Sequence, residues 1–215
     1  MPAITRYDAT TLKNLTTSSN QVTGAQLQSI FNSELTPKMT YLSAVPVTSS
    51  DYIALRNQFL ENVPVKNQGH VIANTLTDSE LKDIKVIDNG DYYYEIQLTL
   101  KDETFSTLPS VSSGSSHGKI FDILTKEHMD GILNKFNSTD QLSISYNSFK
   151  QKYHDSTLTI GINKINNHIE YANYDMNIDI EVSGFTLKVT GMSTKMDVSF
   201  DCNNIINIDF AAYNS

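Results

Sequence analysis

Several residue types are scarce in this chain of 215 residues, and each scarcity narrows what the protein can do. Cys202 is the only cysteine, so the chain cannot form an internal disulfide and offers no cysteine pair to a zinc ion. Positive charge is also scarce, because 16 basic residues face 24 acidic ones and the net charge is −8. Nucleic acids and anionic membrane surfaces both bind through clustered positive charge, so we expect neither as a partner.

Long apolar runs are absent from the sequence as well. No segment approaches the roughly 20 apolar residues that span a bilayer, so we expect no transmembrane helix. The first residues, Met1-Pro2-Ala3, lack the basic region and the apolar core of a secretory leader. The sequence therefore fits either a cytoplasmic protein or the mature part of an exported one.

The feature that stands out instead is the alternation of apolar and polar residues in short segments between Leu142 and Phe210. Successive side chains of a strand point to opposite faces, so each segment buries one side and exposes the other. This pattern predicts an antiparallel sheet with one covered face. The alternating apolar sets are Leu142, Ile144 and Tyr146; Leu158, Ile160 and Ile162; Ile178, Ile180 and Val182; Phe185, Leu187 and Val189; Met196, Val198 and Phe200; and Ile206, Ile208 and Phe210.

Tight turns are predicted at three places in the sequence. Asn89-Gly90 is a strong hairpin signal, because a type I′ turn needs positive φ at both central residues. This turn would join Ile84–Ile87 to Tyr92–Leu100. Ser183-Gly184 and Asn166-Asn167 predict two further turns between strands.

Three regions follow the apolar period of amphipathic helices. The first begins at a capping box formed by Thr23 and Gln26, in which each side chain can bond the backbone of the other residue. Helices of this kind most often bury their apolar stripe in the core, and we expect the same here. The three regions are 23–36, 49–63 and 116–136, the last with a break before Thr125.

Residues 1–22 form a polar tract rich in threonine and serine. Such a tract buries too little apolar surface to offset the entropy lost on ordering, so we predict a flexible polar linker or arm. Residues 23–215 are predicted to form a single α+β domain, in which a curved antiparallel β-sheet meander has helices packed on one face. Counting alternating segments gives about six to eight strands for this sheet.

The motif Gly114-Ser115-Ser116-His117-Gly118 matches the G-x-S-x-G pattern of serine hydrolases. In those enzymes a buried strand leads into the serine turn, whereas the preceding Pro109–Ser113 does not read as a buried strand. Two interpretations remain: a serine hydrolase that uses Ser116 and His117, or a helix start that Ser115 or Ser116 caps. Because the context of the motif is wrong, we favour the helix start and expect no enzymatic activity.

Neither a metal ion nor a cofactor is predicted. The histidines show no H-E-x-x-H spacing, and the sequence has no phosphate loop and no dinucleotide fingerprint. Asp88-Asn89-Gly90-Asp91 resembles a fragment of a calcium loop, but a hairpin turn explains it better. A carboxylate pair for glycoside hydrolysis would form only in three dimensions. With no tryptophan in the chain, Tyr92–Tyr94 is the remaining candidate for an aromatic sugar platform.

The order of segments from Tyr94 onward also matches a known pattern. Tyr94–Glu103 is followed by Ser115–Thr125, which carries Ser-Ser-His-Gly-Lys-x-Phe-Asp, and then by a strand at Tyr153. Over roughly residues 84–213 the chain resembles an uncharacterised domain of secreted or lipid-anchored proteins from Gram-positive gut bacteria of the clostridial type. The resemblance implies export and a cell-envelope setting, but no activity.

The expected architecture is also similar to that of bacterial lipoprotein-carrier domains, which hold acyl chains between a sheet and helices. Our first hypothesis is therefore a non-enzymatic extracellular or cell-envelope module that binds a lipid, another apolar ligand or a partner in such a cavity. Solid packing of the same residues is the alternative interpretation. The residues expected to line the cavity are Met129, Ile132, Phe136, Ile160, Ile178 and Ile180.

The second hypothesis is a structural or adhesive surface domain without a small ligand. It would contact a cell-surface macromolecule through the tyrosine, asparagine and threonine side chains of the exposed sheet face. A serine hydrolase is the third hypothesis. We expect an extracellular or surface-anchored location, with a cytoplasmic location left open.

Overall fold

Nine strands, three short α-helices and one 3₁₀-helix make up the regular structure in the described part of this computed structural model. The structure describes residues 3–30, 41–46, 76–88, 90–110, 115–120, 123–137, 142–189 and 192–210. The strands are β1 (Ala3–Thr17), β2 (Tyr41–Pro46), β3 (Leu81–Asp88), β4 (Tyr93–Leu100), β5 (Glu103–Phe105), β6 (Leu142–Ser145), β7 (Ser148–Asn163), β8 (Ile169–Val189) and β9 (Met192–Asp209). The helices are α1 (Gly24–Ile30), the 3₁₀-helix η2 (Asp78–Glu80), α4 (Ser116–Ile120) and α5 (Lys126–Phe136).

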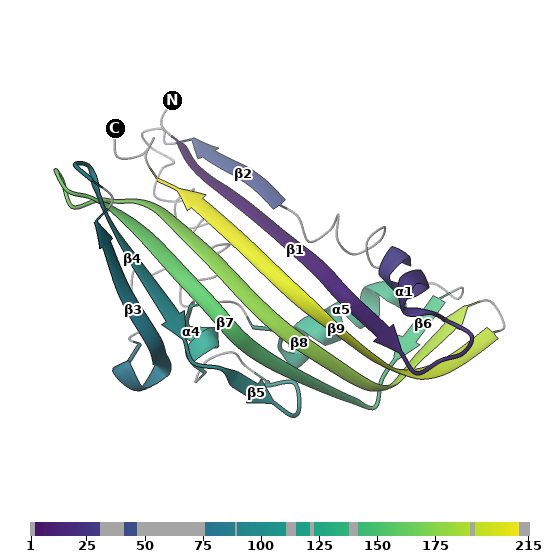
Figure 1. Cartoon of the computed structure of the whole chain (residues 1–215). Coiled ribbons are helices and arrows are strands. Elements are labelled where there is room, and N and C mark those ends of the chain that lie inside the picture. Colours follow the sequence, from purple (N-terminus) through teal and green to yellow (C-terminus); the bar gives the residue numbers. More distant parts are fainter. Residues whose placement is uncertain are drawn as a thin grey trace.

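All described strands belong to one antiparallel sheet, in the order β2-β1-β9-β8-β7-β4-β3 (Figure 1). The short strand β5 pairs with β7, and β6 pairs with β8. The centre of the sheet consists of the long strands β7, β8 and β9, which have 16, 21 and 18 residues. Long strands can pair over their whole length here because short turns connect them in sequence order.

The predicted α+β class, with helices packed on one face of a sheet, is wrong. Of the described residues 62% lie in strands and 15% in helices, so the protein is mostly β. Among the buried apolar side chains of the described residues, only Leu27 and Ile120 belong to helices. The core is therefore built mainly by strands. The helix predicted over 49–63 lies outside the described residues.

The predicted flexible arm over residues 1–22 is also wrong for most of that segment. Ala3–Thr17 form β1, which pairs with β9 on one side and with β2 on the other. The polar composition misled the prediction, because this strand gains its stability from backbone pairing on both sides. Leu12 and Leu15 are both buried although they are three residues apart, because β1 is irregular between them: Asn14 has a φ of 53° and the register with β9 shifts between Lys13 and Thr16.

The turn predictions had mixed outcomes. The hairpin of β3 and β4 and the turn around Asn167, between β7 and β8, are confirmed. Ser183-Gly184 is not a turn, because β8 continues through it and the register with β9 shifts between Val182 and Phe185. Gly184 has a φ of 59°, and a Cβ there would lie 2.3 Å from the Asn147 side chain, so the site is a bulge that requires glycine.

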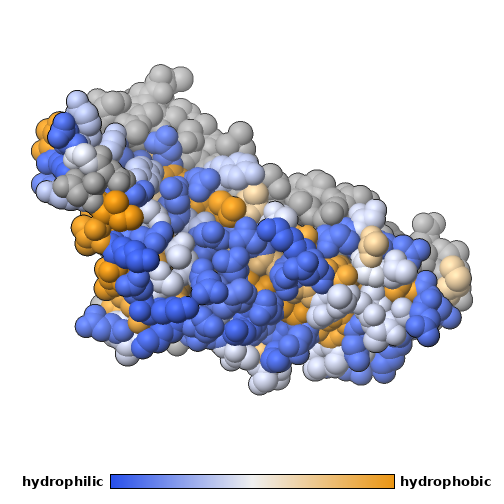
Figure 2. Space-filling model, in the orientation of Figure 1, coloured by the Kyte–Doolittle hydropathy of each residue, from blue (hydrophilic) through white to orange (hydrophobic). Residues whose placement is uncertain are grey.

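The alternation predicted for β7, β8 and β9 is confirmed and gives the sheet two unlike faces. On β8 the side chains from Ala172 to Val182 are buried at every second position. We call the side of the sheet to which these buried residues belong the covered face, and the opposite side the open face. In Figure 1 α4 and α5 lie behind the sheet, so the open face is toward the viewer, and Figure 2 shows that it is largely hydrophilic.

Candidate functional site

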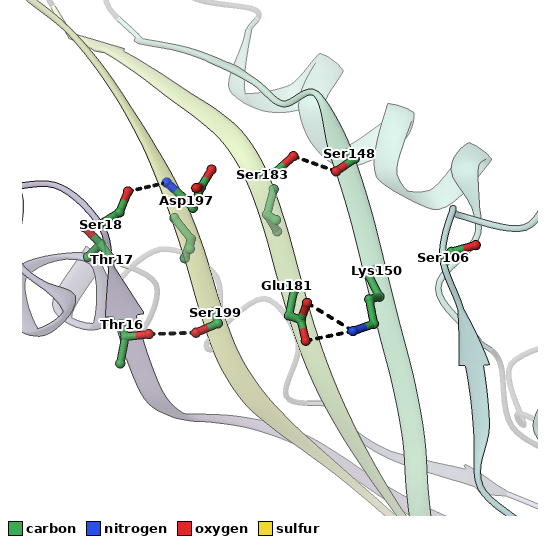
Figure 3. Close-up of a pocket in the computed structure, with 12 residues that line it drawn as sticks. Thr16, Thr17, Ser18, Ser106, Ser148, Lys150, Glu181, Ser183, Asp197 and Ser199 are labelled. Carbon is green, nitrogen blue, oxygen red and sulfur yellow. Dashed lines mark hydrogen bonds and ion pairs between the residues drawn. The ribbon is translucent and has the colours of Figure 1, made fainter.

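A polar groove of about 690 Å³ lies on the open face, where β1, β9, β8 and β7 run side by side (Figure 3). Its volume is within the range of ordinary ligand sites, roughly 300–1,000 Å³. Most of its lining side chains carry a hydroxyl group. The lining residues are Thr16, Thr17, Ser18, Ser106, Ser148, Lys150, Glu181, Val182, Ser183, Asp197, Val198 and Ser199.

The register of the sheet determines which side chains lie next to one another at the centre of the groove. Lys150 of β7 lies opposite Glu181 of β8, Glu181 lies opposite Ser199 of β9, and Ser199 lies opposite Thr16 of β1. Directly opposite residues on one face of an antiparallel pair have Cβ atoms about 5 Å apart. Four polar side chains from four strands therefore form one continuous row across the sheet.

Hydrogen bonds hold this row and its neighbours in place. Lys150 Nζ donates to both carboxylate oxygens of Glu181, at 3.0 and 3.2 Å. The hydroxyls of Thr16 and Ser199 lie 2.7 Å apart. In the next row the hydroxyls of Ser148 and Ser183 are 2.6 Å apart. A hydroxyl has one donor and two acceptor positions, so each of these pairs retains capacity to bond a ligand.

The bulge in β8 positions the remaining carboxylate of the groove. The backbone N–H of Gly184 donates to Asp197 Oδ1 at 2.8 Å. The backbone N–H of Asp197 in turn donates to Ser18 Oγ at 2.8 Å. Asp197 is therefore fixed between the bulge and the end of β1. Ser106, which follows β5, lines the groove on the far side of β7 (Figure 3).

The chemistry of the groove is that of a hydrogen-bonding surface. Its charged side chains are one lysine, which is paired with Glu181, and Asp197. The lining residues include no histidine and no cysteine that could act as a general base or nucleophile. This arrangement can bind a ligand that both donates and accepts hydrogen bonds along its length.

The serine motif forms a helix start in the structure. Ser115 Oγ accepts the backbone N–H of Gly118 at 2.8 Å, so Ser115 caps α4, as one of the two interpretations predicts. The backbone N–H groups of Ser116 and His117 donate to the carboxylate of Glu103, at 2.9 and 2.8 Å. The His117 ring is 0% exposed, so a substrate in solvent does not reach it.

Glu103 and His117 form a polar cluster on the covered face. His117 Nδ1 lies 2.7 Å from Glu103 Oε2, and the ring of His117 contacts the ring of Tyr153, with centroids 5.1 Å apart. Burial alone would raise the pKa of Glu103. The hydrogen bonds from the His117 ring and from the backbone of His117 and Ser116 outweigh burial, so the pKa is lowered. The cluster ties β5 to the start of α4.

The residues expected to line an apolar cavity lie at the covered face where their side chains are described. Ile178 and Ile180 are buried in the main core, and Met129 and Ile160 are half-buried and pack against the same core. The side chains of Ile132 and Phe136 lie outside what the structure describes. The structure thus brings four of the six residues to one core, and the cavity itself stays a prediction.

Other candidates from the sequence have structural roles. Cys202 is buried, and burial raises the pKa of its thiol to about 12, far from that of a reactive thiolate. Tyr93 packs edge-to-face against Tyr171, with ring centroids 6.4 Å apart, while Tyr92 and Tyr94 are exposed. Among the residues that the structure describes, no group of three or more histidine, cysteine or acidic side chains could hold a metal ion.

Sequence reasoning missed the groove entirely. Its residues are small, polar and scattered over the chain, and Thr16 is 183 residues from its partner Ser199. The only available signal was the polar phase of the alternation, which marks Lys150, Glu181 and Ser199 as open-face residues. That phase does not say which residues of different strands lie opposite one another.

Comparison with family models, with curated proteins and with solved structures gave no match for this chain. Within the described ranges, no helix combines the length and the apolar character needed to cross a membrane.

Proposed function

We propose that this protein is a non-catalytic binding module whose open-face groove holds an uncharged, polyhydroxylated chain such as a glycan. The observation that carries this proposal is the continuous row of polar side chains from Thr16 to Lys150, flanked by the serine pair of Ser148 and Ser183. Sugar hydroxyls both donate and accept hydrogen bonds, as the hydroxyls of the groove do.

The charges in the groove support an uncharged ligand over an ionic one. Lys150 is already bonded to both oxygens of Glu181, so an anion would have to displace an existing partner. Asp197 and the net charge of −8 would repel an anionic polymer further. Of the two carboxylates in the groove, Glu181 is paired with Lys150 and Asp197 accepts a backbone N–H, so a cation would also compete with existing partners.

The rigidity of the site also supports binding. Most lining side chains project from long strands that pair with neighbours on both sides, so the backbone beneath them is ordered before a ligand arrives. A backbone that is already ordered loses less conformational entropy on binding. An extracellular or surface-anchored location, where glycans are abundant, belongs to the same proposal and is motivated by the resemblance of residues 84–213 to an envelope domain.

The proposal can be tested by amide NMR titration with soluble neutral glycans (dextran, mannan and chitin oligosaccharides), with polygalacturonate as the anionic comparison. We expect a neutral glycan to shift amides of the groove in β1, β7, β8 and β9. Ser199→Tyr, which fills the groove, should weaken that binding by about tenfold or more, a change of about 1.4 kcal/mol.

Asn207→Tyr is the matched control for this experiment. Asn207 is exposed on the same strand and on the same face as Ser199, but it does not line the groove. It should bind the glycan like the unmodified chain. The proposal is wrong if no neutral glycan shifts groove amides, or if Ser199→Tyr binds as well as Asn207→Tyr.

A further inference from the structure

β3 forms one margin of the sheet. Among the described strands only β4 pairs with it, so the other side of β3 presents backbone N–H and C=O groups to an incoming strand. A register shift at Lys82 interrupts pairing near the start of β3, and the residues from Asp83 to Asp88 pair with β4 without interruption. This regular part is long enough to accept another strand.

Apolar side chains are exposed along the same strand. Ile84 is 51% exposed and Val86 is 68% exposed. Both nevertheless belong to the covered face, whose side chains are buried nearer the centre of the sheet. Ile87, on the opposite side, is exposed as well. Figure 2 shows hydrophobic surface at the left margin, where Figure 1 places β3 and β4. Exposed β-branched residues on an edge strand favour pairing with another strand.

The sequence of β3 is complementary to itself when two copies run antiparallel. If Ile84 lies opposite Ile84 of the second copy, Asp83 lies opposite Lys85, and this charged pair occurs twice. Opposite charges and apolar pairs at directly opposed positions stabilise a sheet. Asp83 and Lys85 already lie 3.3 Å apart within one strand, so the four charges would form one alternating cluster.

Other registers lack this complementarity. Shifting the centre of symmetry by one residue in either direction places Lys85 opposite Lys85, or Asp83 opposite Asp83. Like charges directly opposite each other destabilise strand pairing. The charges of β3 therefore favour one register over its neighbours.

We propose that a second copy of this chain pairs with β3 to form a continuous antiparallel sheet, with a twofold axis at Ile84. The inference is independent of the proposed ligand. A twofold axis perpendicular to the sheet keeps each residue on the same side in both copies, so the two open faces would point in one direction. Two grooves on one surface could then bind one long polymer with increased avidity.

The dimer is expected to be weak and reversible. Pairing of single strands buries less than the roughly 1,200 Å² of a standard stable interface, which is typical of transient association. Sedimentation velocity between about 10 μM and about 1 mM should therefore show the sedimentation coefficient rise with concentration.

Charge variants test the register. Asp83→Lys and Lys85→Asp should each abolish the concentration dependence, because each places like charges opposite each other. An equimolar mixture of the two variants should restore it, because lysines 83 and 85 of one copy then face aspartates of the other. Circular dichroism of each variant shows whether the fold is retained.

Lys195→Asp is the matched control, since Lys195 is an exposed lysine of β9 and the substitution changes the net charge equally. It should dimerise like the unmodified chain. The proposal is overturned if the unmodified chain sediments as a monomer at every concentration, if Lys85→Asp dimerises as Lys195→Asp does, or if the variant mixture stays monomeric. None of these outcomes depends on glycan binding.

Discussion

The sheet carries a histidine–carboxylate contact on each of its faces, and the two differ in their surroundings. On the covered face His117 Nδ1 lies 2.7 Å from Glu103, and the histidine ring is completely buried. On the open face His154 lies 3.1 Å from both Asp155 and Asp179, and its side chain is 27% exposed. The same pair of chemical groups is thus placed in two very different dielectric environments.

This difference indicates different roles. Glu103 also accepts hydrogen bonds from two backbone N–H groups at the start of α4. Removing its carboxylate would leave these donors without a partner in a place that water hardly reaches, which costs stability. The carboxylates around His154 are open to water, which screens their interaction and can replace it. The buried contact is therefore expected to stabilise the fold more than the exposed contact on the open face, where we propose that a ligand binds.

The largest expected difference between buried and exposed positions is in the stability lost when an isoleucine is shortened to alanine. Ile180→Ala should lower the free energy of unfolding by about 2–5 kcal/mol, because it removes buried methyl groups and leaves a cavity. Ile84→Ala, the same change at a half-exposed position, should cost less than about 1 kcal/mol. Urea unfolding at low protein concentration measures both. Equal costs would contradict the distinction between the covered centre and the β3 margin.

Loss of the buried contact between Glu103 and His117 should give the next largest change in the free energy of unfolding. Glu103→Gln should lower the free energy of unfolding at pH 7 by about 1–3 kcal/mol, because a neutral amide replaces a charged acceptor of three hydrogen bonds. Since the pKa of Glu103 is lowered in the folded state, its contribution is full above the ordinary pKa of about 4.3. It is lost as the pH falls through the folded-state pKa.

Urea unfolding of Glu103→Gln at pH 7 and near pH 3 checks this sign. The difference from the unmodified chain should shrink on acidification. Glu127→Gln, at an exposed position in the first turn of α5, is the control and should change little at either pH. A deficit of the Glu103 variant that persists unchanged at low pH would contradict a role for the ionised carboxylate.

The parts of the fold that the sequence predicts are those set by neighbouring residues. The alternation around Ile178 and Ile206 predicts buried strands, because side-chain direction in a strand has a period of two. The capping box is confirmed for the same reason, since Thr23 and Gln26 bond each other over three residues. Ser115 caps α4 through an equally local hydrogen bond.

The parts that the sequence did not predict depend on distant partners. β1 has few apolar residues, and its order comes from pairing with β9, almost 200 residues away. The groove depends on the same pairing, because Thr16 and Glu181 reach one row only through Ser199. Gly184 was wrongly predicted to form a turn. Glycine with positive φ occurs both in turns and in bulges, and only the pairing of β8 with its neighbouring strands shows that this one is a bulge.

Loss of the His154 contact on the open face should lower the free energy of unfolding least of all. This loss should depend on pH in the opposite sense to that of Glu103. Burial would lower the pKa of His154, but Asp155 and Asp179 outweigh it and the pKa is raised. A raised pKa stabilises the fold fully below the ordinary value of about 6.5, and this stabilisation is lost as the pH rises through the folded-state pKa. His154→Gln should therefore cost less than about 1 kcal/mol near pH 5.5 and almost nothing near pH 9.

Salt provides the second test of this contact, because the interaction of exposed charges is screened at high ionic strength. The deficit of His154→Gln at pH 5.5 should shrink in about 1 M NaCl, where the Debye length is about 3 Å. His168→Gln, at an exposed position between β7 and β8, should show no comparable change. A deficit of His154→Gln that grows with pH, or that resists salt, would place this contact with the buried cluster of Glu103 and would remove the functional distinction between the two faces.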